Sequence, residues 1–297
     1  MRQMKITSQN LRTEASAEYS FIDSGNGEKL ERFGPYRFVR PESQALWRPS
    51  LPKRDWQDAD GIFETSAKTG KSGWRLRKDL PDRWQMTFAG VRCLVGPTPF
   101  RHLGVFPEQT PHWEWIKQKI QEGGRSKIRI LNLFGYTGLA SLAAALAGAE
   151  VTHVDASKTA IEWARENQRI SKLDQAPIRW ITDDVLKFLK REIKRGAQYD
   201  GIILDPPKFG RGPKGEVWKI ETDLPTLREL CQKVLSKDPI FVLLTLYATE
   251  CGAASISNIV REIVGNHNGE INFGELVASE ETSGRFLSHA IYARWDK

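Results

Sequence analysis

Two short stretches of the sequence carry residues whose types and spacing suit nucleoside binding and chemistry. The first is Ile-Leu-Asn-Leu-Phe-Gly-Tyr-Thr-Gly at 130–138, and the second is Asp-Gly-Ile-Ile-Leu-Asp-Pro-Pro-Lys at 200–208. A glycine turn after an apolar run lets backbone approach a ligand closely. Each stretch alone is a weak signal. Their order and spacing predict an enzyme that holds a nucleoside cofactor at one strand end and works on a planar nitrogenous substrate at another.

Acidic residues follow the glycine turn at informative positions. Asp155 comes 20 residues after Gly135 and precedes Ala156 and Ser157, which can cap the next helix. An acidic residue at this separation accepts hydrogen bonds from ribose hydroxyls. The following β-run ends in Asp183-Asp184-Val185, where an aspartate can accept from an adenine amino group, with Asp184 the favoured one. The alternative is that either aspartate only caps the following helix.

The glycine turn also indicates which kind of nucleoside cofactor it would hold. It has two glycines rather than the three of the dinucleotide fingerprint, and bulky Tyr136 lies between them. A pyrophosphate needs close backbone approach at this point, so a cofactor without phosphates fits better, and S-adenosylmethionine is one. Its amino-acid tail would face Asn132 and the turn itself, which comprises Phe134, Gly135, Tyr136, Thr137 and Gly138. The alternative is a tight strand-to-helix connection with no ligand, and no cluster of metal ligands is visible.

The second stretch ends the fourth β-run of this part of the chain. Ligands of open α/β sheets bind at the carboxyl ends of the strands. Prolines lack N–H donors, so Asp205-Pro206-Pro207-Lys208 leaves carbonyl groups and the Asp205 carboxylate as acceptors for a base amine. We therefore predict that Asp205, Pro206, Pro207 and Lys208 lie at the reaction site. The alternative is an ordinary strand-to-loop turn with an aspartate cap.

The hydrophobic pattern predicts the elements that would position these residues. From about residue 110, apolar β-runs alternate with helical segments, which predicts a mainly parallel sheet with helices on both faces. The expected strands are 127–134, 150–154, 178–181, 199–204 and 240–246, and the expected helices are 112–120, 139–146, 160–169, 185–194, 224–235 and 255–264. Two final β-runs, 271–278 and 289–295, have no helix between them. They predict a terminal antiparallel hairpin added to the sheet.

The remainder of the chain predicts three segments. Residues 1–18 are polar and are expected to be a mobile lead-in, residues 19–105 a small β-rich module, and residues 106–297 the α/β domain. Tryptophans in the module could stack on bases while nearby cations hold phosphates, or the tryptophans could form a small core. These residues are Trp47, Trp56, Trp74 and Trp84, with Arg48, Arg75, Arg77 and Lys78.

Composition sets the broad class. The 297 residues are 40% hydrophobic and 27% charged, without an apolar run long enough to span a membrane or a signal-peptide core at the start. Three scattered cysteines exclude a disulfide framework and indicate a reducing cytoplasm. The net charge of +7 favours a polyanionic partner such as nucleic acid, although many basic proteins bind none.

Taken together, these motifs resemble class I S-adenosylmethionine-dependent methyltransferases. More closely, they are similar to the bacterial 23S ribosomal RNA large-subunit methyltransferase group that carries Asp-Pro-Pro-Lys. The resemblance rests on 104–109, 132–138, 155–157, 183–184, 205–209, the basic glycine loop 210–215 and the closing 292–295. It implies a Rossmann-like seven-stranded methyltransferase sheet, S-adenosylmethionine as cofactor and RNA as partner. It also implies that Phe106 and Gln109 lie at or near the cofactor and that Asp205–Lys208 lies beside the target base.

One departure from this group bears on the methylated atom. Its 5-methylcytosine members carry a cysteine just after the fifth strand, where the thiolate attacks the pyrimidine ring. Here Cys251 lies six residues past Thr245, while Cys93 and Cys231 are expected to be structural. We therefore predict methylation of a nitrogen rather than a carbon. The alternative that a backbone bend brings Cys251 to the end of the strand stays open. Tyr136 and Phe209 could sandwich a base or merely pack.

Two other functions also stay open at this point. One is a methyltransferase that acts on a protein side chain or a small molecule, and the other is a non-catalytic RNA-binding protein. The sequence leaves the RNA site and the oligomeric state undetermined.

Overall fold

The computed structural model describes residues 4–65, 70–247 and 250–297, and the chain divides into two compact units. The first unit comprises Met1–Leu11, Pro111–Leu276 and Ala290–Lys297, and the second comprises Arg12–Thr110 and Val277–His289. The second unit therefore includes part of the terminal hairpin, residues 277–289. The three consecutive segments expected from the sequence, 1–18, 19–105 and 106–297, do not include this return of the chain.

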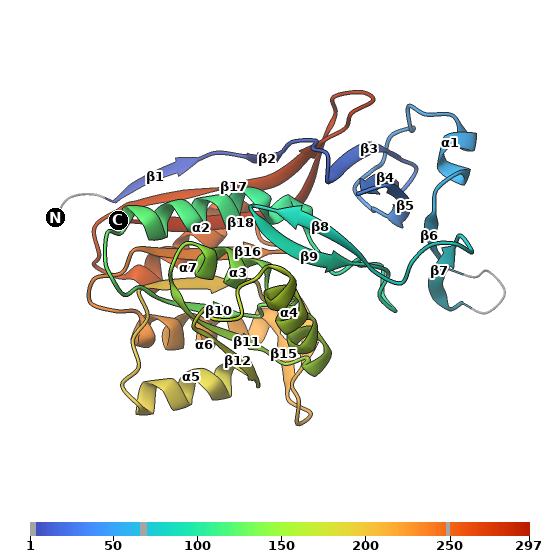
Figure 1. The fold of residues 1–297 in the computed structure, drawn as a ribbon. Helices are drawn as coiled ribbons and strands as arrows, with labels where there is room; N and C mark the ends of the chain where they lie inside the picture. The colour runs from blue at the N-terminus through green and yellow to red at the C-terminus, as the bar shows by residue number, and fades with distance from the viewer. Residues whose placement is uncertain (1–3, 66–69, 248–249) are drawn as a thin grey trace. The chain divides into compact units, whose positions relative to one another are not determined.

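A large sheet forms the centre of the first unit. Over the described residues it has nine strands in the order β1-β17-β18-β16-β13-β10-β11-β12, with β2 paired to β17 (Figure 1). The strands that run parallel and carry the predicted motifs are β10 (Arg129–Leu133), β11 (Glu150–Asp155), β12 (Ile178–Thr182), β13 (Gly201–Leu204) and β16 (Phe241–Leu246). β18 (Phe286–Asp296) pairs antiparallel to β16, and β17 (Glu270–Ser279) lies next to β18.

Helices cover both faces of this sheet because successive strand residues point to opposite faces. One face packs on α5 (Val185–Lys194), α6 (Ile220–Val234) and α7 (Ala253–Val264), with β-strand residues such as Leu131, Ile202 and Val242 in that core. The opposite face packs on α2 (Thr110–Glu122) and α3 (Leu139–Leu146), where Ile130 and Ile203 are buried. α4 (Lys158–Ile170) contacts β11, β12 and α3. The predicted fold class, a Rossmann-like α/β sheet with two added terminal strands, is confirmed.

The start of the chain differs from the mobile lead-in that we expect for residues 1–18. It contains the short strands β1 (Lys5–Ser8) and β2 (Leu11–Thr13), while residues 1–3 lie outside the described part. β1 pairs in parallel with Glu270–Phe273 of β17, and the Lys5 ammonium contacts the Glu270 carboxylate at 2.9 Å. The segment is too polar to predict as a strand, and the exposed edge of β17 supplies its backbone partners.

The second unit is β-rich, as expected. Its five-stranded sheet has the order β3 (Tyr19–Gly25), β4 (Glu28–Phe33), β5 (Tyr36–Pro41), β6 (Gly61–Thr65) and β7 (Ser72–Leu76), and α1 (Lys53–Gln57) lies between β5 and β6 in sequence. A separate hairpin joins β8 (Trp84–Phe88) to β9 (Val91–Val95), and the 3-10 helix η1 (Pro107–Gln109) follows. The ring of Phe38 stacks on Trp84 at 5.6 Å and meets Trp74 edge-on at 5.7 Å. These two tryptophans are partly buried and pack on the buried Phe38 ring, which favours the second of the two sequence interpretations for them.

Two elements around the second motif differ in detail from the prediction. The basic glycine loop contains a small antiparallel hairpin of β14 (Phe209–Arg211) and β15 (Val217–Lys219). α6 begins at Ile220, four residues before the predicted start, with Pro225 inside it. The Asp223 carboxylate accepts from the backbone N–H of Lys219 at 2.7 Å, which satisfies a group at the helix start. No helix in the described parts of the chain is both long and apolar enough to cross a membrane.

Candidate functional site

The predicted site residues of the first unit gather at one edge of the large sheet. Because β10 to β13 are parallel, their carboxyl ends lie at the same edge: Leu133 pairs with Val154 and with Leu204, and Asp155 pairs with Thr182. The residues that follow these ends include four aspartates, all of them partly buried: Asp155, Asp183, Asp184 and Asp205. This edge is therefore rich in carboxylates, which suit hydroxyl, amine and cationic ligand groups.

The turn after β10 has an unusual backbone. Phe134 has φ of 60°, Tyr136 of 50° and Gly138 of 89°, so two non-glycine residues adopt the left-handed conformation. Such positions cost roughly 1–3 kcal/mol each, and they persist where surrounding contacts require them. Gly138 is the N-cap of α3, and an added Cβ there would lie 2.9 Å from the Ala164 Cβ and 3.1 Å from the Trp180 ring.

Gly135 does not have a positive φ, and the turn requires a glycine here for a steric reason. A Cβ at Gly135 would lie 2.3 Å from Cε1 of His153, which projects from β11 directly beneath the turn. His153 is fully buried, and burial lowers the pKa of its imidazole to about 3, so the ring is neutral. Its Nδ1 lies 2.9 Å from Oγ of Ser141, which accepts from Nδ2 of Asn132 at 2.8 Å. Asn132 thus belongs to a buried hydrogen-bonded network with Ser141 and His153, and this network packs against the turn.

Asp155 holds the turn and the start of α4 together. One carboxylate oxygen accepts from the Tyr136 N–H at 2.8 Å and the other from the Ser157 N–H at 2.8 Å. Burial raises the pKa of Asp155 above its ordinary value, and the two N–H donors oppose that rise. Ser157 caps α4 by accepting from the Ala160 N–H at 3.2 Å, and Ala156 lies between the two. Thr137 is buried, and its carbonyl accepts from Asn167 at 2.9 Å.

The two aspartates after β12 have structural partners. Asp184 is the N-cap of α5, and its carboxylate accepts from the Lys187 N–H at 2.9 Å. Asp183 accepts from the Asp184 N–H at 2.9 Å and pairs with the Arg191 guanidinium. Val185 is buried in the core beneath them. The helix-cap interpretation therefore describes Asp184, and its adenine role stays a prediction.

A tryptophan that the sequence argument did not single out joins the second motif to the first. Trp218 on β15 donates from Nε1 to the carbonyl of Pro207 at 2.7 Å. Its ring lies 4.9 Å from the ring of Phe134 in the glycine turn. The backbone N–H of Asp205 also contacts the carbonyl of Leu133 at 3.4 Å. The Asp205–Lys208 loop and the glycine turn are therefore packed against each other.

The hairpin that follows this loop presents apolar and basic groups to solvent. Phe209 and Val217 are each 54% exposed, and Lys208 and Arg211 are exposed beside them. At the hairpin end, the Glu216 carboxylate accepts from Lys187 Nζ at 2.6 Å and from the Lys214 N–H at 2.8 Å. The Lys187 contact is the main cause that holds the pKa of Glu216 at about 2. Phe209 is exposed and Tyr136 is partly buried, and whether either ring stacks on a base or merely packs stays open.

The three cysteines differ in their exposure. Cys93 and Cys231 are fully buried, and burial raises the pKa of both thiols. Cys251 is exposed two residues before α7 and lines a pocket of about 250 Å³ together with Leu246 and residues of α6 and α7. Thr245, one residue before the end of β16, is 1% exposed. Over the residues placed in the structure, no three His, Cys, Asp or Glu side chains are grouped to hold a metal.

Phe106 and Gln109 lie in the second unit. Phe106 precedes η1 and packs on His102, with ring centroids 5.0 Å apart, and Gln109 ends that helix and is buried. The carboxylates at the acidic strand edge of the first unit lie next to the turn 134–138. They suit the cationic sulfonium, amino and ribose hydroxyl groups of S-adenosylmethionine.

His153, Ser141 and Trp218 support the site but carry no local sequence signal for it. A histidine within a β-run and a tryptophan within a loop are ordinary core residues unless their neighbours in space are known. Only the proximity of Trp218 to the Asp-Pro-Pro-Lys stretch could have drawn attention to it.

Known proteins provide a separate comparison. A family model described as S-adenosylmethionine-dependent methyltransferase matches residues 70–235. The crystal structure of a SAM-dependent methyltransferase from Agrobacterium tumefaciens is similar, with 47% identity and a TM-score of 0.90 over 99% of this chain and 96% of that chain. Two proteins named ribosomal RNA large subunit methyltransferase K/L are also similar. The one from Pseudoalteromonas atlantica is 33% identical over 75% of this chain and 33% of its own length. The one from Hahella chejuensis is 38% identical over 62% of this chain and 25% of its own length. The chain thus spans about a quarter to a third of these curated relatives.

Proposed function

The chain belongs to the S-adenosylmethionine-dependent methyltransferase family, and we propose that it methylates a nitrogen of a base in ribosomal RNA. The observation that carries this proposal is the packing of the Asp205–Lys208 loop against the glycine turn through Trp218 and Phe134. It brings an acceptor-rich loop next to the turn that we propose as the cofactor site. The ribosomal substrate follows the names of the K/L relatives.

The residues of the site suit positioning rather than covalent catalysis. When bound, S-adenosylmethionine supplies an activated methyl group on a positively charged sulfur. Asp155 would accept from its ribose hydroxyls, and the backbone of 134–138 would contact its tail. The Asp205 carboxylate and the Pro206 carbonyl would accept from an exocyclic amine and so turn the nitrogen lone pair toward the methyl group. Holding the two reactants in line and excluding water provides most of the rate gain in such a reaction.

Nitrogen is proposed over carbon because carbon methylation of a pyrimidine needs a thiolate at the ring. Cys93 and Cys231 are enclosed, and Cys251 lies five residues beyond Leu246, the last residue of β16, instead of directly after the strand. An amine nitrogen needs no such nucleophile, since its own lone pair attacks. The basic and aromatic hairpin around Phe209 would receive the RNA next to the loop, with its cations on phosphates. We also propose that this activity is cytoplasmic, as the few scattered cysteines predict.

The test is nucleoside mass spectrometry of large-subunit ribosomal RNA from cells with and without the gene, followed by methyl transfer with the purified protein. We expect a base methylated on nitrogen to be missing in the deletion and to be restored in vitro. A missing 5-methylcytosine would overturn the nitrogen assignment and implicate Cys251. Transfer to ribosomal proteins but not to RNA would overturn the substrate class. If calorimetry shows no S-adenosylmethionine binding at high micromolar concentrations, a non-catalytic RNA-binding function replaces the enzyme.

A further inference from the structure

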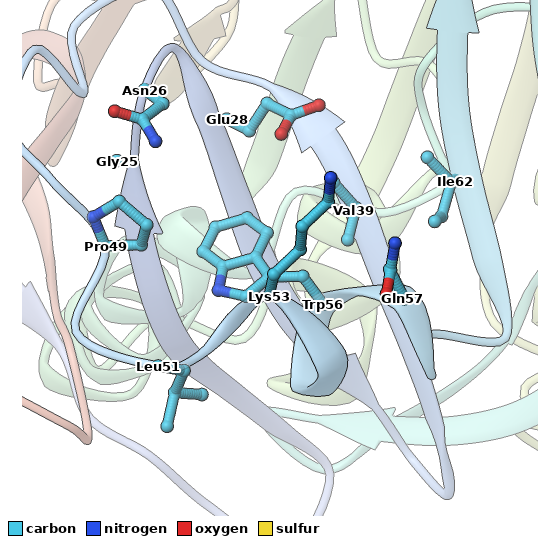
Figure 2. A pocket seen from close by; sticks show the side chains of 10 residues that line it. All are labelled: Gly25, Asn26, Glu28, Val39, Pro49, Leu51, Lys53, Trp56, Gln57 and Ile62. Atoms are coloured by element: carbon cyan, nitrogen blue, oxygen red, sulfur yellow. The ribbon is translucent and has the colours of Figure 1, made fainter.

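Two pockets with apolar walls lie in different units of the protein. One, of about 400 Å³, lies between the five-stranded sheet and α1 of the second unit, and its lining includes Val39, Leu51, Trp56 and Ile62 (Figure 2). The other, of about 250 Å³, lies between α6 and α7 of the first unit and is called the α6–α7 pocket below. It shares its unit with the Asp205–Lys208 loop, the reaction loop of the proposed function.

The α6–α7 pocket lies at the carboxyl edge of the large sheet. Leu246, which lines it, is the last residue of β16. β16 pairs with β13, where Leu244 lies opposite Leu204, the residue before Asp205. β10, which leads into the glycine turn, is the neighbour of β13 on its other side. Along this edge, the pocket, the reaction loop and the glycine turn therefore follow the strands β16, β13 and β10 in that order.

A backbone contact also joins the pocket to the reaction loop. Ile220, the first residue of α6 and part of the pocket wall, donates its N–H to the carbonyl of Lys208 at 3.1 Å. The preceding residue, Lys219, pairs with Phe209 across the β14–β15 hairpin. Lys208 and Lys219 are both exposed, and neither has a carboxylate partner among the residues that the structure describes. Two lysines therefore flank the junction of loop and pocket, where they suit a phosphate group.

The walls of the pocket suit a nucleobase. Its apolar lining comes from Ile220, Leu224, Pro225, Leu246 and Ile259. Enzymes that act on nucleic acids hold unstacked bases between apolar side chains of this kind. The volume lies below the roughly 300 Å³ at which pockets for drug-sized ligands begin, so one flat ring system fits better than a larger ligand.

Pro225 also affects the hydrogen bonding of this wall. It lies inside α6, where a proline has no N–H to donate to the carbonyl four residues earlier. That carbonyl belongs to Glu221, which lines the pocket. Every nucleobase carries an N–H donor on its Watson–Crick edge, the edge by which proteins recognise unstacked bases of RNA. A base in the pocket would therefore supply the donor that the helix lacks.

We propose that the α6–α7 pocket binds the base of the nucleotide next to the target nucleotide, while Lys208 and Lys219 hold the phosphate between the two. The target base itself lies at Asp205. This inference rests on the proposed function, because it assigns a second contact to the same RNA. Both nucleotides must be unstacked to reach their sites, so the substrate is a single-stranded segment of the RNA.

The variant Pro225→Ala tests the proposal in the full chain, because it restores an N–H to α6 and removes part of the pocket wall. We expect its Tm to rise by a few degrees, since proline is the least favourable residue inside a helix. The KM for protein-free large-subunit ribosomal RNA should rise about fivefold, the scale of one lost hydrogen bond. The matched control is Thr222→Ala, exposed on the same helix and outside the pocket lining, which should keep KM within about twofold.

Cys251 gives a second readout that needs no change to the pocket. It lines the pocket and is exposed, whereas Cys93 and Cys231 are fully buried, so N-ethylmaleimide should label Cys251 in the folded protein. We expect the same RNA, at about ten times its Kd, to slow this labelling about tenfold by occupying the pocket. The control is Cys251→Ser/Ala254→Cys, which moves the thiol to an exposed position of α7 outside the pocket lining. Its labelling should slow by less than about twofold.

The pocket assignment is wrong if RNA leaves the labelling of Cys251 unchanged, if it protects the control equally, or if Pro225→Ala keeps the wild-type KM. A raised KM that comes with a lower Tm is a folding defect, and the labelling then decides. The proposed function fails separately. If RNA protects Cys251 but accepts no methyl group, the nucleotide pocket stands and the methylation substrate is wrong. If RNA is methylated while Cys251 stays unprotected, only the pocket is wrong, and if RNA does neither, both are wrong.

Discussion

Asp205 is the residue whose chemistry can be tested most directly. It follows a fully buried strand and precedes two prolines, so its position is set by the strand and not by a flexible loop. If its carboxylate accepts from the target amine, its charge matters in the transfer step more than in cofactor binding.

We expect Asp205→Asn to lower kcat for methyl transfer by about 100-fold or more, because a preorganised charged acceptor next to a reacting amine contributes on this scale. The Kd for S-adenosylmethionine, measured by calorimetry, should change by less than about threefold, a small difference in free energy. Asp174→Asn, at an exposed position, is the matched control and should leave both unchanged. An Asp205→Asn enzyme with normal kcat would remove Asp205 from the reaction.

Gly135 tests the steric role of the glycine turn. Gly135→Ala would place a methyl group against the His153 ring, and overpacking of this kind costs about 1–3 kcal/mol of unfolding free energy. Thermal unfolding should show the loss, and the affinity for S-adenosylmethionine should fall with it.

The control is Gly73→Ala on β7, where an added Cβ meets no atom of the described residues within 4 Å. His153→Ala removes the clashing ring, so the double variant Gly135→Ala/His153→Ala should lose less stability than the two single losses added together. Additive losses would show that the turn is not limited by His153.

At the scale of elements, the β14–β15 hairpin fastens the reaction loop to the glycine turn. Trp218 of this hairpin makes both connections: its indole N–H donates to the Pro207 carbonyl, and its ring packs on Phe134. The hairpin is therefore a positioning element, and its loss should affect geometry before it affects folding.

Trp218→Phe keeps an aromatic ring but deletes the N–H to Pro207. We expect a loss of about 1–3 kcal/mol in stability from the missing hydrogen bond and the smaller ring. We also expect kcat to fall about tenfold, since a loosened loop misaligns the reactants. Trp295→Phe is a matched control: Trp295 is fully buried in the same core, and its N–H has no acceptor among the described residues. Equal losses of kcat in both variants would mean that the hairpin bond has no special role.

At the scale of the whole molecule, the β-rich unit depends on buried charge. Glu31 is 1% exposed, and Arg40 holds it through two hydrogen bonds of 2.8 Å, with Tyr19 donating at 2.9 Å. Burial acts to raise the pKa of Glu31, but Arg40 and Lys29 outweigh it, so the pKa lies below its ordinary value. Its stabilising contribution is therefore present above the unfolded pKa of about 4.3 and is lost as the pH falls through the lower folded value.

Arg40→Met should invert this dependence. It leaves a buried carboxylate without its main partner, which costs about 3–5 kcal/mol at neutral pH. Burial then raises the pKa of Glu31, so the deficit relative to the wild type should shrink as the pH falls toward 4 and the group takes up a proton. Urea unfolding at several pH values measures this, with Arg40→Met/Glu31→Gln as the control. A deficit that does not change with pH would show that Lys29 alone keeps Glu31 ionised.

The sequence by itself determined the alternation of strands and helices in the first unit, the terminal hairpin and the family. The bounds of α3 and α5 match the predicted ranges, because apolar periodicity and capping residues act over a few positions along the chain. The distance from Gly135 to Asp155 is likewise a property of one strand-helix-strand unit. Such information is local, and the sequence contains it directly.

Only the tertiary structure decided how the site is supported. It places His153 beneath Gly135, joins Trp218 to the Asp-Pro-Pro-Lys loop, and gives Asp184 to a helix cap. It also places the α6–α7 pocket next to the reaction loop. These features depend on which strands become neighbours: β13 lies beside β10 although about 70 residues separate them in the chain. Contacts across such separations are set by the packing of the whole sheet, which no local pattern of residue types encodes.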